Sequence, residues 1–241
     1  TNRLGRKVTL TWIGFFFFFS ALGSALAVDP YTFSFFRFIG GIAVGVSSVT
    51  APIYISEITT PKNRGTLGVL YQFSLVFGIL IAYFSNYLLT GFDGSNDWRW
   101  MLGIEAIPAL LYLLMTLYIP DSPRWLVLFK NDDLTAQKVL EVIYSNKSEA
   151  DDVLKSIKST DNTVSKENNL FIPRFKKTIL LAFFISFFNQ LSGINFILYY
   201  APEILEMGGF ATKESLFNSV IIGLTNIVFT FGGLLLIDRL G

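Results

Sequence analysis

Residues 189–195 read Asn-Gln-Leu-Ser-Gly-Ile-Asn, inside an apolar run that begins near Thr178 and is long enough to cross a bilayer. This stretch places three carboxamides where an unsatisfied polar group is costly. A carboxamide offers both donors and an acceptor without charge, so it suits a neutral solute rich in hydroxyl groups. The stretch predicts a binding site near the bilayer midplane. The alternative is that the amides only join neighbouring helices.

The spacing of two of these amides predicts a broken helix. On a straight helix, Gln190 and Asn195 would point about 140° apart, because each residue turns by about 100°. Both can bind one ligand only if the helix breaks between them, and Gly193 is the residue that permits a break. Transporters use broken helices at membrane depth to line their binding cavities.

The composition indicates an all-α membrane protein. Of 241 residues, 52% are hydrophobic, 25 are Phe and only 15% are charged, which is not typical of a soluble domain. The net charge of +1 argues against nucleic acid as a partner. The absence of Cys and His excludes disulfides, thiolate nucleophiles, imidazole bases and the usual zinc sites. We therefore expect no enzyme activity, metal or cofactor.

Six apolar runs have about the length that a membrane span requires. Gly41 and Gly45 form a small-xxx-small pair within them, which is expected to let two helices approach closely. The chain has no initial Met and enters the first run directly, so we interpret it as a fragment. The six runs are Val8–Val28, Phe33–Ile55, Leu67–Leu89, Trp100–Ile119, Thr178–Tyr200 and Leu216–Ile237.

The basic residues predict how the chain is oriented. Almost all of them fall in alternate connections, including every basic residue from Arg124 to Lys177. The opposite connections contain only Arg99 and Lys213. Because positive charge favours the cytoplasmic side, we expect a multi-pass protein of the cell membrane with both ends of the chain in the cytoplasm.

A polar segment divides the apolar runs into two groups. We expect residues 1–119 and 178–241 to belong to two transmembrane bundles, and 120–177 to form a small cytoplasmic helical domain. Asp133 is expected to cap a first helix that ends near Tyr144. Ser148 is expected to open a second one through a capping box with Asp151. Residues 159–169 read as a linker.

Several motifs, in this order, resemble those of one known family. Residues 2–7 (NRLGRK) are echoed by 238–241 (DRLG), residues 39–45 read IGGIAVG, and residues 120–126 read PDSPRWL. Residues 190–195 (QLSGIN) and 199–202 (YYAP) follow within the fifth apolar run. Together they are similar to the sugar porter family of the major facilitator superfamily. The likeness covers essentially the whole chain and implies helices three to eight of twelve.

The resemblance implies a set of sugar-binding amides. Hydropathy alone places Gln72 near the cytoplasmic end of its run, so we expect that helix to begin earlier, close to Lys62. Asn189 stands where the family usually has a second Gln. Tyr199 and Tyr200 would form an extracellular gate. The amides that the resemblance assigns to the sugar are Gln72, Asn189, Gln190, Asn195 and Asn226.

Charged residues at the inner helix ends could close a gate between the bundles. The resemblance implies that they stabilise the outward-facing state, and semi-exposed pairs of about 1 kcal/mol each could break as the bundles rock. Their alternative role is to set topology through positive charge. The residues are Arg3, Arg6, Glu57, Arg64, Asp121, Arg124, Asp238 and Arg239.

Two charges fall inside the runs themselves. Arg37 and Glu105 should lie close enough to interact, because an intramembrane charge needs a partner. In proton-coupled members of the family an acid of the first helix sits beside this arginine, so the pair is a candidate for coupling. The alternative is a pair that only fixes helix packing.

These features together predict a secondary transporter that moves a monosaccharide by alternating access, with or without coupling to protons. The bilayer, a sugar and protons are the expected partners. The alternatives are a polyol or inositol carrier, and a membrane receptor that binds a sugar without moving it. An enzyme ranks last, because no nucleophile–base pair occurs at a consistent depth.

Overall fold

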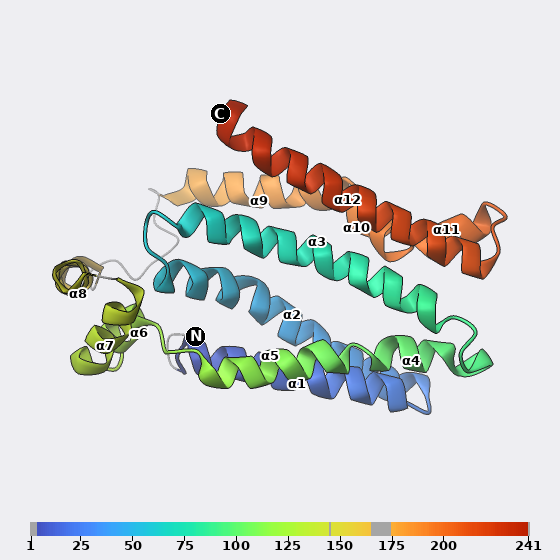
Figure 1. Ribbon diagram of the computed structural model, residues 1–241, viewed down its shortest axis with the longest axis horizontal. Helices are drawn as coiled ribbons and strands as arrows, with labels where there is room; N and C mark the ends of the chain where they lie inside the picture. Colours follow the sequence, from blue (N-terminus) through green and yellow to red (C-terminus); the bar gives the residue numbers. More distant parts are fainter. Residues whose placement is uncertain (1–3, 145, 165–174, 241) are drawn as a thin grey trace.

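The chain folds into long helices that lie side by side, with a group of short helices at one end (Figure 1). This computed structural model describes residues 4–144, 146–164 and 175–240. Side chains are not described at position 64, nor at 160–164, 234, 235 and 237–240. Every regular element in the described ranges is helical.

Within the part of the chain that the structure describes, five segments are long and apolar enough to cross a membrane. These segments match five of the six predicted runs, and the fifth run is the one that is not among them. Its helix is interrupted twice, so it forms three shorter elements. The five membrane-spanning candidates lie in α1 (Arg6–Leu26), α2 (Pro30–Ile58), α3 (Arg64–Leu89), the α4–α5 pair (Asp97–Gly103 and Ala106–Tyr118) and α12 (Thr212–Leu240). The 3₁₀ turn Gly94–Asn96 precedes α4.

The interrupted run covers α9 (Lys176–Leu191) and α10 (Ile194–Tyr199), and α11 (Ala201–Met207) follows it directly. Gly193 separates the first two, as predicted, and has a φ of 75° in the left-handed region. The second interruption lies at Tyr200 and precedes Pro202, whose missing N–H cannot continue the helical hydrogen bonds. The break at Gly193 confirms the prediction of a broken helix in this run, whereas the interruption at Tyr200 was not predicted.

The fourth predicted run also contains a break, which divides α4 from α5 at Ile104 and Glu105. Its cause is Pro108, which has no N–H to donate to the Ile104 carbonyl. That carbonyl instead accepts a hydrogen bond from Ile107 N, 3.1 Å away. The break places Glu105 at the N-terminus of α5.

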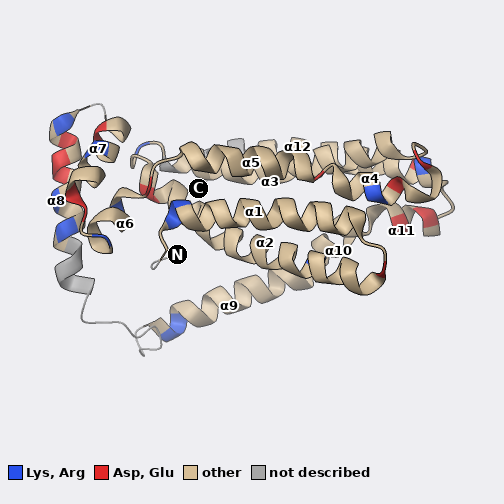
Figure 2. Cartoon of the chain, turned by 90° about the horizontal axis from the view of Figure 1, so that it is seen from below, with Lys and Arg blue, Asp and Glu red and all other residues tan. Residues whose placement is uncertain are grey.

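The short helices are α6 (Pro123–Leu128), α7 (Asp133–Ile143) and α8 (Lys147–Val164). They pack on one another around Leu126, Val127 and Ala136. We call the end of the molecule where they lie the insert end, and the opposite end the far end. Figure 2 shows the charged residues concentrated at these two ends, whereas the long helices between them are almost free of charge.

The expected insert helices are present, but their caps are one or two residues away from the predicted ones. Asp132, not Asp133, caps α7, because its side chain accepts a hydrogen bond from Thr135 N at 3.0 Å. Asn146 accepts from Ser148 N at 3.1 Å, so Ser148 does not open α8. The helix also continues to Val164, through the first part of the predicted linker, and residues 165–169 lie outside the described ranges.

The long helices form two packing groups. α1 packs against α2, α4 and α5, with Leu10, Ile13, Ala43 and Tyr54 at its core. α3 packs mainly along α12, where the rings of Phe73 and Phe231 lie 5.2 Å apart.

Close helix approach occurs at other glycines than the predicted pair. A Cβ at Gly14 would lie 3.0 Å from the Leu113 Cα, so α1 and α5 touch through this glycine. Gly41 and Gly45 have no atom of the described residues within 4 Å of such a position, so the described helices do not approach each other closely there.

Candidate functional site

The predicted amide pair comes together across the break at Gly193. The Asn195 Nδ2 donates a hydrogen bond to the Gln190 Oε1 over 3.1 Å. α9 ends at Leu191 and α10 begins at Ile194, so the left-handed turn redirects the chain between them. Each amide keeps further hydrogen-bonding capacity for a ligand, because a carboxamide has two donors and two lone pairs.

Two of the other three predicted amides, Gln72 and Asn226, lie on neighbouring helices. Ring contacts of Phe73 with Phe231 and of Tyr87 with Phe217 set the antiparallel register of α3 and α12. In this register Asn226 lies opposite Gly78, about 9 Å along the axis from Gln72 at about 1.5 Å per residue. α3 begins at Arg64, which confirms the prediction that this helix starts before its hydrophobic run and includes Gln72.

Among the described residues, no side-chain hydrogen bond joins these amides to the pair at the break. Gln72 is exposed, Asn226 is half-buried, and neither makes a side-chain hydrogen bond there. The Asn189 side chain is also exposed, and only its backbone carbonyl is used, by Ser192. Of the five predicted binding residues, only Gln190 and Asn195 are joined by a side-chain hydrogen bond in the described part of the chain.

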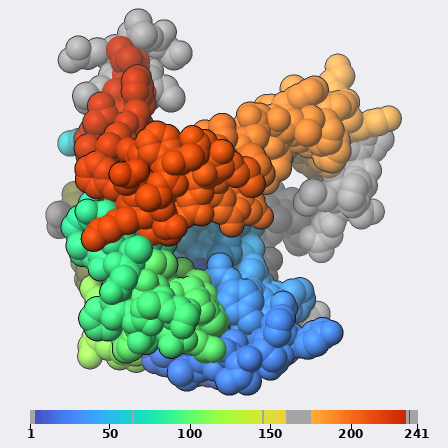
Figure 3. All heavy atoms as spheres, turned by 90° about the vertical axis from the view of Figure 1, so that its right-hand side faces the viewer, coloured from blue at the N-terminus to red at the C-terminus, as the bar shows by residue number. Residues whose placement is uncertain are grey.

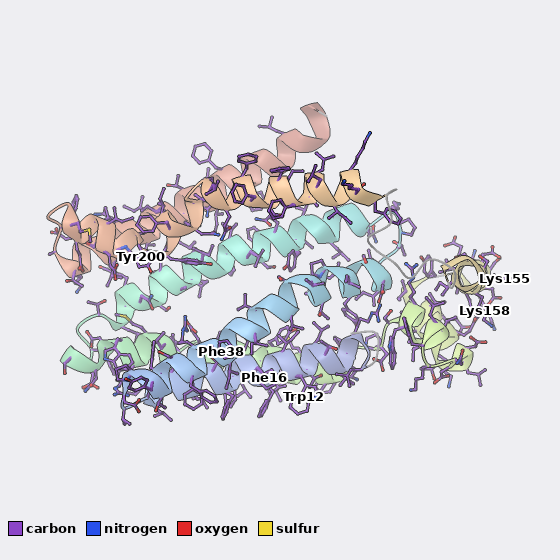
Figure 4. The ribbon with its side chains drawn as sticks, turned by 180° about the vertical axis from the view of Figure 1, so that it is seen from behind. Trp12, Phe16, Phe38, Lys155, Lys158 and Tyr200 are labelled. Atoms are coloured by element: carbon purple, nitrogen blue, oxygen red, sulfur yellow. The ribbon has the colours of Figure 1, made fainter. Side chains whose placement is uncertain are left out.

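The two predicted gate tyrosines flank the second interruption. Tyr199 ends α10 and is 78% exposed, whereas Tyr200 packs its ring 5.2 Å from that of Phe196. Figure 4 marks Tyr200 at the junction of α10 and α11. Seen from the far end, a recess separates α9–α12 from α1 and α2 (Figure 3).

Arg37 and Glu105 lie 3.6 Å apart between Nη1 and Oε2, so their predicted proximity is confirmed. Both side chains are about half exposed, at 48% and 53%. They line a cavity of about 750 Å³ that is bounded by α1, α2, α3 and α5. The hydroxyl group of Tyr112, another residue of its wall, is buried without a hydrogen-bond partner among the described residues. None of the predicted sugar-binding amides lines this cavity.

One pair of the predicted charge network is formed at the insert end. Arg6 donates from Nε and Nη2 to the two carboxylate oxygens of Glu57, at 2.9 and 3.0 Å. Their side chains are only 8% and 7% exposed, so this is a buried pair and not the semi-exposed pair expected from the sequence. The guanidinium group of Arg6 also lies 5.9 Å from the centre of the Phe129 ring.

Among the described residues, the other predicted members of the charge network form no ion pair like that of Arg6 and Glu57, and some of their side chains are not described. Arg124 and Glu57 line one cleft of about 340 Å³ between the end of α2 and the helices α7 and α8. One carboxylate oxygen of Asp121 is buried without a hydrogen-bond partner among the described residues. Arg3 and the side chains of Arg64, Asp238 and Arg239 lie outside what the structure describes.

The sequence profile of a family described as "Sugar (and other) transporter" matches residues 1–241. The chain belongs to this family. The sugar transporter family consists of transporters and not of enzymes, in agreement with the absence of a catalytic constellation in the sequence.

Curated relatives of this sugar transporter family member match it over almost its whole length. It is 38% identical to the galactose-proton symporter of Escherichia coli strain K12 over 246 residues, which are 99% of this chain and 51% of the symporter. It is 34% identical to the D-xylose transporter of Levilactobacillus brevis, covering 100% of this chain and 52% of that protein. The chain thus spans about half the length of the curated relatives that it matches.

Solved structures show the same fold. The xylose transporter XylE from Escherichia coli, in a partially occluded inward open conformation, matches with a TM-score of 0.85 and 31% identity over 100% of this chain and 57% of that one. Its inward open conformation gives a TM-score of 0.79 over 99% of this chain and 53% of that one. The chain therefore has an all-α membrane fold of the major facilitator superfamily.

Sequence reasoning missed one contact near the amide pair. The Tyr83 hydroxyl group of α3 donates a hydrogen bond to the Leu198 carbonyl of α10. Nothing around Tyr83 distinguishes it from the other aromatic residues of its apolar run, so the sequence carries no direct signal for it. An indirect signal was Pro202, which leaves a carbonyl of the preceding turn without its helical donor.

Proposed function

We propose that the whole protein is a secondary transporter that moves a monosaccharide across the cell membrane by alternating access. The observation that carries this proposal is the Gln190–Asn195 amide pair, which is formed across a left-handed break in a hydrophobic helix. Uncharged amides can replace the water around sugar hydroxyl groups without burying a charge. A solute that lacks a hydroxyl group would leave buried amides unpaired, and this gives selectivity.

The remaining predicted residues have proposed roles around this pair. Gln72, Asn189 and Asn226 complete the sugar site, and Tyr199 and Tyr200 close it at the far end. The packing of α3 along α12, which puts Gln72 and Asn226 on neighbouring helices, supports their place in the site. Names of relatives support the substrate class, since they include a galactose-proton symporter, an arabinose-proton symporter and a D-xylose transporter.

The charged residues have proposed roles in gating and coupling. The insert end would face the cytoplasm, where most Lys and Arg lie, and the network around Arg6 and Glu57 would close the inner gate. Arg37 and Glu105 would couple the movement to protons, because they form an ion pair beside a cavity. Residues 1–119 and 178–241 would belong to the two rocking bundles, and 120–177 to a domain that links them.

Counterflow in proteoliposomes tests this function directly. Vesicles that contain the purified whole protein are loaded with unlabelled hexose or pentose and diluted into a trace of the same labelled sugar. A transporter accumulates the label transiently, and a polyol such as inositol in place of the sugar does not support this. Accumulation with inositol alone would instead indicate a polyol carrier. Saturable binding of the sugar without counterflow would indicate a receptor and overturn the proposal.

A further inference from the structure

Tyr83 connects two helices that are far apart in the sequence. Its hydroxyl group donates a hydrogen bond to the backbone carbonyl of Leu198, which lies 115 positions later in the chain. Tyr83 is 8% exposed and lies in the C-terminal third of α3, whereas Leu198 belongs to α10, the six-residue segment between the interruptions at Gly193 and Tyr200. This bond thus attaches a short, isolated helical segment to a long one.

Pro202 explains why the Leu198 carbonyl is free to accept this bond. In a continuous α-helix, that carbonyl would accept from the N–H group four residues later. Position 202 is a proline and has no N–H group, so the helix itself cannot supply this donor. A backbone carbonyl without a hydrogen-bond donor is energetically unfavourable at membrane depth. The Tyr83 hydroxyl group supplies this donor in place of the absent N–H group of residue 202.

The Tyr83 ring is held from its other side by α12. A Cβ atom at Gly223 would lie 3.0 Å from Cδ2 of this ring and 3.3 Å from the Leu80 Cα atom. A side chain at this position would be tightly crowded by α3, so the glycine favours the close approach of α12. The Tyr83 ring therefore packs against α12 at Gly223, while its hydroxyl group bonds to Leu198 of α10.

We propose that Tyr83 is a positioning residue, which holds α10 against α3 by supplying the hydrogen-bond donor that Pro202 lacks. α10 begins with the turn that joins Gln190 to Asn195 and ends at the predicted gate tyrosines. Its position therefore fixes the amide pair and the gate together. This consequence for the gate rests on the proposed transport function, but the attachment of α10 to α3 does not.

Hydrogen exchange of the backbone amides of α10 tests the attachment without any substrate. The whole protein is placed in lipid nanodiscs, and exchange of peptides from residues 194–207 is followed by mass spectrometry. Tyr83→Phe removes only the hydroxyl group and should speed this exchange about five-fold, as expected when one net hydrogen bond is lost. Tyr87→Phe is the matched control, because Tyr87 lies one turn along α3 and packs on Phe217 without a hydrogen bond among the described residues.

A second variant separates this role from general loosening. Pro202→Ala restores an N–H group at position 202, so Tyr83→Phe should have a much smaller effect on exchange in that background. Unchanged exchange in Tyr83→Phe, or an equal rise in Tyr87→Phe, would overturn the proposal. A full Tyr83→Phe effect in the Pro202→Ala background would also overturn it, because the tyrosine would then not replace the missing donor.

Counterflow measured on the same preparations distinguishes this inference from the proposed function. If the parent protein shows no sugar counterflow but the exchange results are as expected, the transport function fails and the attachment stands. If the parent transports sugar and the exchange does not depend on Tyr83, the inference fails and the function stands.

Discussion

Asn195 and Gln190 are hydrogen-bonded through Nδ2 and Oε1, 3.1 Å apart, although they belong to two different helical segments. On an unbroken helix they would point about 140° apart. The left-handed turn at Gly193 removes this separation. A cluster of amides in an apolar run thus becomes a converging pair because one residue in it has no side chain.

Gly193→Ala should weaken both stability and transport. No atom lies within 4 Å of a Cβ at this position, so the added methyl group has room. Its cost is conformational, because a φ of 75° is unfavourable by about 1–2 kcal/mol for an L-residue with a side chain. Thermal unfolding in detergent measures the loss, and Gly193→Asn should lose less because Asn tolerates this conformation.

Gly78→Ala is the control for that experiment. Gly78 also has no neighbour within 4 Å, but it lies within α3 at ordinary helical angles, where Ala is the better helix former. It should be neutral or slightly stabilising. Equal losses in both variants would contradict the role given to the backbone at Gly193.

Removing one partner of the Arg6–Glu57 pair should be strongly destabilising. Both side chains are buried, so Glu57→Ala removes a carboxylate that accepts two hydrogen bonds from the buried guanidinium group of Arg6. The expected loss is about 3–5 kcal/mol of unfolding free energy. The double variant, in which both residues are Ala, should lose clearly less than the sum of the single losses. Additive losses in this double-mutant cycle would show that the two residues do not interact.

The Arg37–Glu105 pair should contribute little to stability, because its side chains are half exposed. Glu105→Gln is expected to change the unfolding free energy by less than about 1 kcal/mol. If the pair takes part in coupling, the same variant flattens the dependence of sugar uptake on external pH. An unchanged pH profile with slightly lower stability would instead indicate a pair that only fixes packing.

Asp29 should make the stability of α2 depend on pH in the acidic range. Its carboxylate accepts from the Thr32 side chain and backbone and from Tyr31 N, and these bonds keep its pKa below the ordinary value. A lowered pKa means that the contribution is fully present above the ordinary carboxyl pKa and is lost as the pH falls through the lowered one. Asp29→Ala should therefore unfold more readily than the parent at neutral pH, and this difference should vanish in strong acid.

Much of the fold could be predicted from periodic properties of the sequence. Apolar length located five continuous spans and the polar insert, and the position of Gly193 located the main break. Local competition between hydrogen-bond acceptors was harder to predict, which is why Asp132 caps α7 instead of its neighbour Asp133. Gly41 and Gly45 show the same limit, since a small-residue spacing indicates where close approach is possible but not which helix lies opposite.

The candidate site was predictable where its residues are close in sequence. Gln190 and Asn195 are five positions apart, and one backbone turn decides whether they meet. Whether Gln72 and Asn226 converge on this pair depends on the rotation of three helices about their axes, which neither hydropathy nor spacing determines. Tyr83 was missed for a related reason, because its partner is a backbone carbonyl that a distant proline leaves free.

The most direct test of the amide pair is sugar uptake by variants of the whole protein, divided by the amount of folded protein in the membrane. Gln190→Ala and Asn195→Ala should each lower uptake about tenfold or more, the effect of losing a buried hydrogen bond to the solute. The double variant should be little worse than either, because the two amides act as a unit. Asn86→Ala, which removes an amide of α3 that has no proposed role, should transport like the parent. Normal uptake by Gln190→Ala at equal abundance would contradict the account.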